Sequence, residues 1–169
     1  FNNNQRNFVK ETDVNSNILF RQNTDTIANN TQKEIHERRR RSSAKIRLGF
    51  TSPNGYHKQI LLGFMNELAS AGIDKGYDAP QLDNLTNDMC FINNNVKLSI
   101  QGDGFFNRFR IFPLSVKIDS EGVVKFTLDG VENLESNQKI YIYDAITNEY
   151  YNIKNEPYTV SLQVGNFDN

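Results

Sequence analysis

The sequence predicts an all-β domain: an antiparallel β-sandwich, jelly-roll-like, with about eight strands and few or no helices. Three observations support this prediction. From Ser43 onward, apolar and polar residues alternate with a period of two, as in strands with one buried face. Turn signals separate these segments at spacings of roughly 8–14 residues, as in sandwiches and barrels. The 12 Phe, 7 Tyr and many Asn residues favour short strands joined by turns.

The first two strands are expected to form a hairpin. In residues 44–50 four apolar side chains alternate with two basic ones and a glycine, which predicts a strand with one buried face. Residues 52–56 contain a Pro and an Asn-Gly pair, which predict a tight turn into a partner strand at 57–64. A second hairpin is expected within residues 90–102, around a run of Asn.

The later strands follow from the same alternation. Residues 108–119 alternate on both sides of Pro113, which predicts a strand interrupted by a bulge or placed at an edge. The remaining strands are expected within residues 123–131, 139–144, 149–153 and 158–167.

Helical signals are few. Residues 64–72 predict two helical turns ended by Gly72. Residues 30–39 have a helical composition but almost no apolar stripe, so a loop or a frayed turn is expected there.

The chain has the length of one domain, and we divide it into two regions of the same module. Residues 43–169 form the predicted sandwich. Residues 1–42 are polar and weakly patterned, and we interpret them as an N-terminal strand plus a flexible connection. The sequence begins without Met and carries neither a signal peptide nor an apolar run of the ~20 residues that a spanning helix needs, so no transmembrane segment is expected. We therefore expect a piece of a larger protein.

Charge excludes one class of function. The formal net charge is −1 and the isoelectric point is near 6.2, which argues against a nucleic-acid-binding protein. The four consecutive arginines at 38–41 are the exception. We interpret them as a solvated approach to the first strand that also discourages edge pairing. Contact with an anionic surface, such as lipid headgroups, is the alternative.

One loop carries a possible metal site. Asp74, Asp78 and Asp83, with Gly76 permitting a tight bend, could supply oxygen ligands to a structural calcium ion. Their spacing does not match the EF-hand loop. The alternative is that these carboxylates cap turns, as loop aspartates commonly do.

Catalytic residues are scarce, and we expect no enzyme. His36 and His57 are the two histidines, and neither has an acid and a nucleophile near it in the sequence. Cys90, the single cysteine, stands on a predicted strand, where a small buried apolar role is expected. The G-x-G at residues 102–104 precedes no predicted helix, so it is a turn rather than a phosphate-binding loop.

Aromatic residues are the remaining candidates for a binding site. They are Tyr141, Tyr143, Tyr150 and Tyr151 in the strands, and Phe105, Phe106 and Phe109 in a loop. Such aromatic surfaces bind sugars or protein partners, whereas aromatic residues in strands more often pack across the sheet. We therefore regard the tyrosines as possible glycan or partner contacts.

The chain resembles a known module over almost all of its 169 residues. The resembling segments, in order, are "FNNNQR", "KIRLGFTSPNGYHKQILLGF", "GIDKGYDA", "KLSIQG", "FPLSVKIDSEGVVKFTLDGVENL" and "KIYIYDAITNEYYNIKNEPYTVSLQVGNFDN". Together they are similar to the β-sandwich module that precedes the C-terminal sorting domain in cargo proteins of the Bacteroidota type IX secretion system. Two features depart from that module: it often has an aromatic residue near Arg47 and Leu48, and the arginine run here is dense.

The resemblance implies a function in protein transport rather than catalysis. It implies a secreted protein that the outer-membrane translocon and its shuttle protein recognise through a C-terminal sorting signal, expected downstream and absent from this sequence. It also implies a location at the cell surface or outside the cell, and some members are adhesins linked to gliding motility. A glycan-binding or adhesive module that contacts a surface polysaccharide is the alternative. A match of residues 25–27 to the short pattern at which Bacteroidota attach O-glycans marks Thr26 as a possible glycosylation site.

Overall fold

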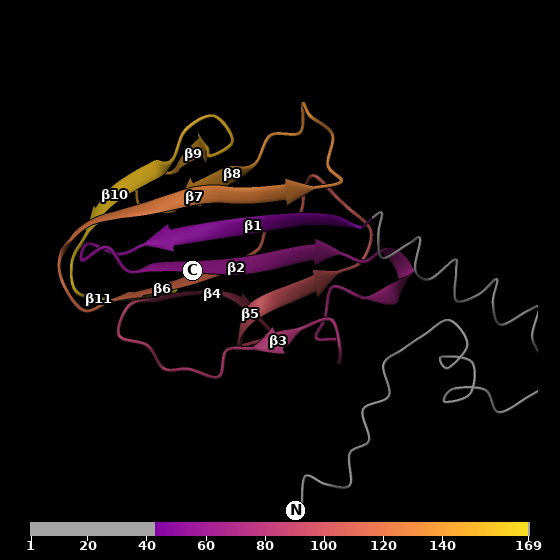
Figure 1. Cartoon of the computed structure of the whole chain (residues 1–169), viewed down its shortest axis with the longest axis horizontal. Helices are drawn as coiled ribbons and strands as arrows, with labels where there is room; N and C mark the ends of the chain where they lie inside the picture. The colour runs from indigo at the N-terminus through magenta and orange to yellow at the C-terminus, as the bar shows by residue number, and fades with distance from the viewer. Residues whose placement is uncertain (1–42, 169) are drawn as a thin grey trace, which may run out of the picture. The chain divides into compact units, whose positions relative to one another are not determined.

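The computed structural model describes residues 43–168, which form a nine-stranded sheet and a separate two-stranded sheet (Figure 1). The strands are β1 (Ala44–Thr51), β2 (His57–Phe64), β3 (Ala79–Pro80), β4 (Asp88–Asn93), β5 (Val96–Asp103), β6 (Leu114–Ile118), β7 (Gly122–Glu132), β8 (Tyr141–Asp144), β9 (Glu149–Asn152), β10 (Tyr158–Leu162) and β11 (Gly165–Asp168). The main sheet has the order β10-β7-β1-β2-β5-β4-β6-β11, with β3 also paired to β5. The predicted all-β class is confirmed.

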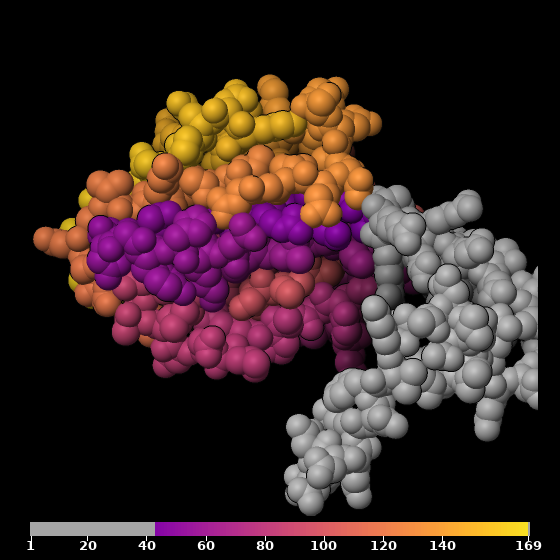
Figure 2. Space-filling view, in the orientation of Figure 1, coloured from indigo at the N-terminus to yellow at the C-terminus, as the bar shows by residue number. Residues whose placement is uncertain are grey.

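The main sheet is mixed, because β2 and β5 pair in parallel while its other pairs are antiparallel. Parallel strands need a long crossover connection, and residues 65–95 provide one. The sheet has more strands than the roughly eight expected for a sandwich. It curls on itself, so that β1, β2 and β7 share one apolar core with β4 and β6. Figure 2 shows β7 and β1 lying side by side on the near face.

The core is built by the predicted alternation. In β1, Ala44, Leu48 and Phe50 are buried, and the partner strand β2 buries Ile60 and Leu62 against them. Ile46 also packs against this core, while Lys45, Arg47 and Gly49 lie on the outer face. In β1 one face is therefore apolar and the other polar, as the period of two predicts.

Both predicted hairpins are present. The β1–β2 turn is closed by a hydrogen bond from the Ser52 N–H to the Tyr56 carbonyl at 2.9 Å, and Gly55 takes a φ of 86° that favours glycine. In the β4–β5 hairpin, Asn94 and Asn95 have φ values of 48° and 63°. Two successive positive φ values are the signature of a two-residue type I′ turn, which Asn tolerates.

Three segments differ from their predictions. Residues 64–72 form one short 3-10 turn, Asn66–Leu68, because the backbone is extended at Ala69 and the Ser70 N–H donates to the Asp74 carboxylate instead of a helical carbonyl. The strand predicted around Pro113 begins only at Leu114. The strand predicted at 158–167 divides into β10 and β11, which pair at opposite edges of the main sheet.

The small sheet is a hairpin of β8 and β9, which lie within the strands predicted at 139–144 and 149–153. It is extended by a hydrogen bond from the Ile153 N–H to the Ile140 carbonyl at 3.0 Å. Ile140, Ile142 and Ile153 pack against the core of the main sheet, so the hairpin covers part of its apolar side. No helix within residues 43–168 is long and apolar enough to cross a membrane. The strand and connection predicted for residues 1–42 lie outside the described residues.

Candidate functional site

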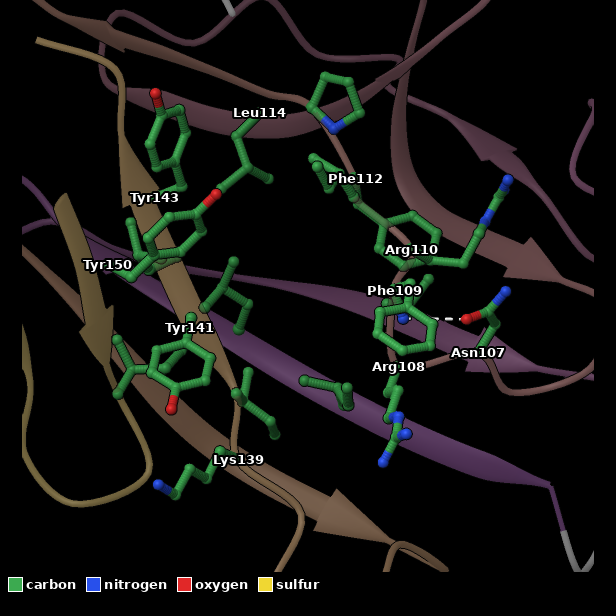
Figure 3. A pocket seen from close by; sticks show the side chains of 18 of the residues that line it. Asn107, Arg108, Phe109, Arg110, Phe112, Leu114, Lys139, Tyr141, Tyr143 and Tyr150 are labelled. Atoms are coloured by element: carbon green, nitrogen blue, oxygen red, sulfur yellow. Dashed lines mark hydrogen bonds between the residues drawn. The ribbon is translucent and has the colours of Figure 1, made fainter. Parts of the chain in front are cut away.

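A cleft of about 650 Å³ opens between the β8–β9 hairpin and the core-facing side of the main sheet (Figure 3). Its floor is apolar, and Leu48 of β1 with Leu62 and Phe64 of β2 contribute buried side chains to it. Figure 3 shows the tyrosines of the hairpin on one side of the cleft and residues 107–112 on the other. These two sides bring together segments that lie about thirty residues apart in the sequence.

Three of the four predicted tyrosines line this cleft: Tyr141, Tyr143 and Tyr150. Tyr143 lies opposite Tyr150 in the hairpin register, and their ring centroids are 4.7 Å apart. The ring of Tyr141 meets that of Tyr150 edge-on at 6.3 Å. Tyr150 is 65% exposed and Tyr141 47% exposed, so this aromatic cluster is open to solvent.

Tyr151, the fourth tyrosine, has a different role. It points to the other face of the hairpin, where its ring stacks on Tyr158 of β10 at 4.1 Å. Its hydroxyl donates to a Glu149 carboxylate oxygen at 2.6 Å, and this hydrogen bond raises the pKa of Tyr151. Tyr151 therefore packs across the sheets, as the alternative interpretation of the tyrosines predicted.

The other side of the cleft is the irregular segment that precedes β6. The Asn107 carboxamide oxygen accepts from the Phe109 N–H at 2.9 Å, which turns the chain. Within this segment Phe106 and Phe112 pack on Phe64, with centroid distances of 5.0 and 5.9 Å. Phe109, by contrast, is 78% exposed. The segment therefore presents apolar side chains both to the core and to solvent.

The charges at the cleft are of one sign. Among the described residues that line it, Arg108, Arg110 and Lys139 are basic and none is acidic. The Arg110 Nε donates to an Asp103 carboxylate oxygen at 2.9 Å, so this cation is already paired. Arg108 lies over the Phe109 ring, 5.0 Å from its centroid, and neither Arg108 nor Lys139 forms an ion pair with another residue of the described region.

A second, smaller cleft of about 400 Å³ lies beside the first. The two clefts share the side chains of Leu114, Ile142, Tyr143 and Ala145, so the end of β8 separates them. The smaller cleft carries the opposite charge: among its described lining residues the charged ones are aspartates, at positions 144 and 168.

One hydrogen bond fastens the small sheet to the main sheet at this point. The hydroxyl of Tyr158, buried on β10, donates to an Asp144 carboxylate oxygen at 2.7 Å. This hydrogen bond lowers the pKa of Asp144. Burial, followed by the neighbouring carboxylate, raises the pKa of Tyr158 well above its ordinary range. The pair therefore favours a neutral tyrosine and an ionised aspartate.

The three aspartates predicted as calcium ligands do not form a metal site in the part of the chain that the structure describes. Asp74 instead accepts from the Ser70 N–H at 2.6 Å, and Asp78 accepts from the N–H groups of Asp74 at 2.5 Å and Gly102 at 2.8 Å. The hydrogen bonds from the Ser70 N–H and hydroxyl lower the pKa of Asp74. The geometry is that of the alternative, in which Asp74 and Asp78 hold loop backbone.

A polar cluster that the sequence does not reveal lies on the outer face of β1, β2 and β7. The His57 Nε2 meets an Asp129 carboxylate oxygen at 2.9 Å, and its Nδ1 meets the Thr51 hydroxyl at 2.9 Å. Gln59 donates to the same carboxylate at 3.0 Å. His57 and Asp129 are 72 residues apart, so no local pattern could join them. None of these residues lines either cleft.

Cys90 is buried, as expected for a small apolar residue, and burial raises the pKa of its thiol. Thr26, His36 and the arginines at 38–41 lie outside the described residues.

The model of a family described as a domain of unknown function (DUF8693) matches residues 1–169. No curated protein and no solved structure matches the chain. Function therefore has to be argued from the geometry of the site and from the residues that build it.

Proposed function

The chain belongs to the DUF8693 family, and we propose that it is a non-enzymatic binding module of an exported cell-surface protein, with the larger cleft as its binding site. The observation that carries this proposal is the cleft itself. Its volume of about 650 Å³ is within the range of small-molecule sites, and its walls are largely apolar with a few polar groups at the edge.

Exposed apolar side chains around the cleft support binding over a purely structural role. Phe109 is 78% exposed, Ile111 is 77% exposed, and Tyr150 adds a second exposed ring nearby. Large apolar side chains gathered on a surface mark interaction sites, because leaving them in water costs free energy that a ligand would recover.

A binding role without catalysis agrees with where the titratable groups lie. In the described part of the chain, the one His–Asp pair is on the outer face of the main sheet, and neither of its residues lines a cleft. The Cys90 thiol is buried and does not line a cleft. Among the residues that the structure describes, a substrate held in the larger cleft would therefore meet no matched acid, base and nucleophile.

Export is the second part of the proposal, and the resemblance to type IX cargo modules supports it. The full-length protein would be handled by the outer-membrane translocon and the shuttle protein, through a C-terminal sorting signal. The test is purification of the native protein from outer membranes, with mass spectrometry of its partners. Recovery of translocon or shuttle components is expected, and their consistent absence while other surface proteins are recovered would count against export by this route.

A glycan is one candidate for the ligand, favoured by the exposed cluster of Tyr141, Tyr143 and Tyr150. The apolar face of a sugar ring can stack on exposed tyrosine rings, and a tyrosine hydroxyl can form a hydrogen bond to it. This role would make the module adhesive toward a surface polysaccharide.

Two tyrosine variants test whether a glycan binds at this cluster. Binding of the full chain to a polysaccharide panel is measured for Tyr141→Ala and Tyr150→Ala, with Tyr56→Ala as the control because Tyr56 is exposed and does not line the cleft. Loss of at least tenfold in affinity in both cleft variants, with the control unchanged, is expected if sugars stack there. Equal binding by all three variants would remove the tyrosines from the site.

A further inference from the structure

We propose that the larger cleft binds a single-chain fatty acid, with the acyl chain over the apolar floor and the carboxylate at Arg108 and Lys139. This inference rests on the proposed function only in taking the cleft as the binding site. It deepens that proposal by naming an anionic amphiphile as the ligand. Its two supports are the composition of the floor and the sign of the charge around it.

The floor offers almost nothing for a polar ligand to bind. Side chains from β1, β2 and β4 contribute only carbon surface to it: Ile46, Leu48, Leu62, Phe64 and Phe91. A sugar hydroxyl pressed against such a surface would lose its hydrogen bonds to water without replacement. An acyl chain has no such groups, and its burial is favourable along its whole length.

The charge at the cleft fits an acidic head group. In a chain with a formal net charge of −1, this cleft has three basic lining residues and no acidic one among those the structure describes. The neighbouring cleft has two acidic lining residues, Asp144 and Asp168, and no basic one among those that the structure describes. The two clefts therefore differ in electrostatic preference although both are largely apolar, and an anion is favoured only in the larger one.

Two of the three basic residues, Arg108 and Lys139, are available to bind a ligand carboxylate. Arg110 is held by Asp103, as described above, and serves mainly to fix the segment beside Phe112. Arg108 is supported from one side by the Phe109 ring and exposed, and Lys139 lies next to Tyr141 at the start of the hairpin. An arginine guanidinium can donate two parallel hydrogen bonds to one carboxylate, which suits Arg108 to this position.

A homologous series of ligands tests the acyl chain. Isothermal titration of the full chain with octanoate, decanoate and dodecanoate, at pH 8 and below micelle formation, measures affinity against chain length. If each methylene is buried on the floor, affinity rises by about fourfold per added carbon. Affinity that does not change with chain length would overturn the proposal, because it would mean that the apolar floor is not used.

The head group is tested with decanoate against decyltrimethylammonium and decanol, which share its alkyl chain. Decanoate is expected to bind most tightly, and Arg108→Ala to weaken it by about two- to fivefold, the size expected for an exposed ion pair. Lys125→Ala is the control, since Lys125 is exposed on β7 and lines neither cleft. A preference for the cationic ligand, or equal losses in both variants, would contradict the assignment of the charge.

A steric variant locates the site without disturbing the core. Ala145→Trp adds a large side chain at an exposed turn residue that lines both clefts, and it is expected to weaken dodecanoate binding at least tenfold while leaving the melting temperature unchanged. Unchanged affinity in this variant, together with unchanged affinity in Arg108→Ala, would place the fatty acid elsewhere and overturn the proposal.

The outcomes separate this inference from the proposed function. Binding of a polysaccharide that needs Tyr141 and Tyr150, with no binding of any alkyl carboxylate, would overturn the fatty acid and leave the binding module standing. Absence of both ligand classes would count against both proposals. Sedimentation with anionic vesicles but no titration with monomeric dodecanoate would overturn the free fatty acid in favour of a membrane surface.

Discussion

Gly49 shows how one absent side chain organises the outer face of the main sheet. A Cβ built at Gly49 would lie 2.4 Å from the carboxylate oxygens of Asp129 and 2.3 Å from the Thr127 hydroxyl. Because glycine leaves this space free, the carboxylate can lie against the strand and accept from His57 and Gln59. Burial alone would raise the pKa of Asp129. The hydrogen bonds from Gln59, Thr127 and His57 outweigh burial and lower that pKa.

Gly49→Ala is therefore expected to destabilise the fold by about 1–3 kcal/mol, since the methyl group would displace the Asp129 carboxylate from its partners. Urea unfolding measures the change. Gly130→Ala is the matched control, because a Cβ there meets Arg47 at ordinary distances of 3.5 Å and more. An equal loss in both variants would mean that glycine flexibility, and not the space beside Asp129, explains the effect.

The Tyr158–Asp144 pair makes stability depend on pH at both ends of the range. The pKa of Asp144 is lowered by folding, so its contribution is present above about pH 4 and lost as the pH falls below that value. The pKa of Tyr158 is raised by folding, so its contribution is present below about pH 10 and lost as the pH rises above it.

Tyr158→Phe is expected to lower stability by about 1 kcal/mol near neutral pH and to flatten part of the decline beyond pH 10. Urea unfolding at a series of pH values measures both effects. Tyr56→Phe, at an exposed tyrosine outside both clefts, is the control. A Tyr158→Phe profile that runs parallel to that of the unaltered protein above pH 10 would show that Tyr158 does not supply this dependence.

At the level of single elements, local chemistry decides how far the sequence predicts the structure. The β4–β5 hairpin is predictable because its two-residue turn needs positive φ values at Asn94 and Asn95, and Asn is a residue that tolerates them. Residues 108–113 are different. They alternate like a strand, yet Phe112 packs inward on Phe64 while Phe109 is left exposed, and this choice depends on distant partners.

The turn itself can be tested at position 95. Asn95→Val should destabilise the protein by about 1–2 kcal/mol, since a β-branched residue is strained at a φ of 63°. Asn95→Gly also removes the Asn side chain, but glycine adopts that φ without strain. This variant should therefore be neutral or slightly stabilising. Thermal unfolding compares the two variants, and equal destabilisation would show that the Asn side chain matters more than the backbone.

At the level of the whole molecule, the cleft exists only because distant strands are placed together. Alternation predicts which residues of β1 and β2 face the core, but it cannot predict that β2 pairs in parallel with β5 or that the β8–β9 hairpin covers the core beside them. The sequence therefore identified the tyrosines as candidates without showing what they face. It gave no indication of Arg108 or of the apolar floor, because neither belongs to a motif.

The claim that this cleft is the binding site predicts where a ligand must appear. The direct measurement is methyl NMR of the full chain during titration with dodecanoate. The largest shifts are expected at Ile46, Leu62 and Ile142, which line the cleft. Shifts centred instead on Val123 and Leu61, which lie outside both clefts, would contradict the assignment of this cleft as the binding site.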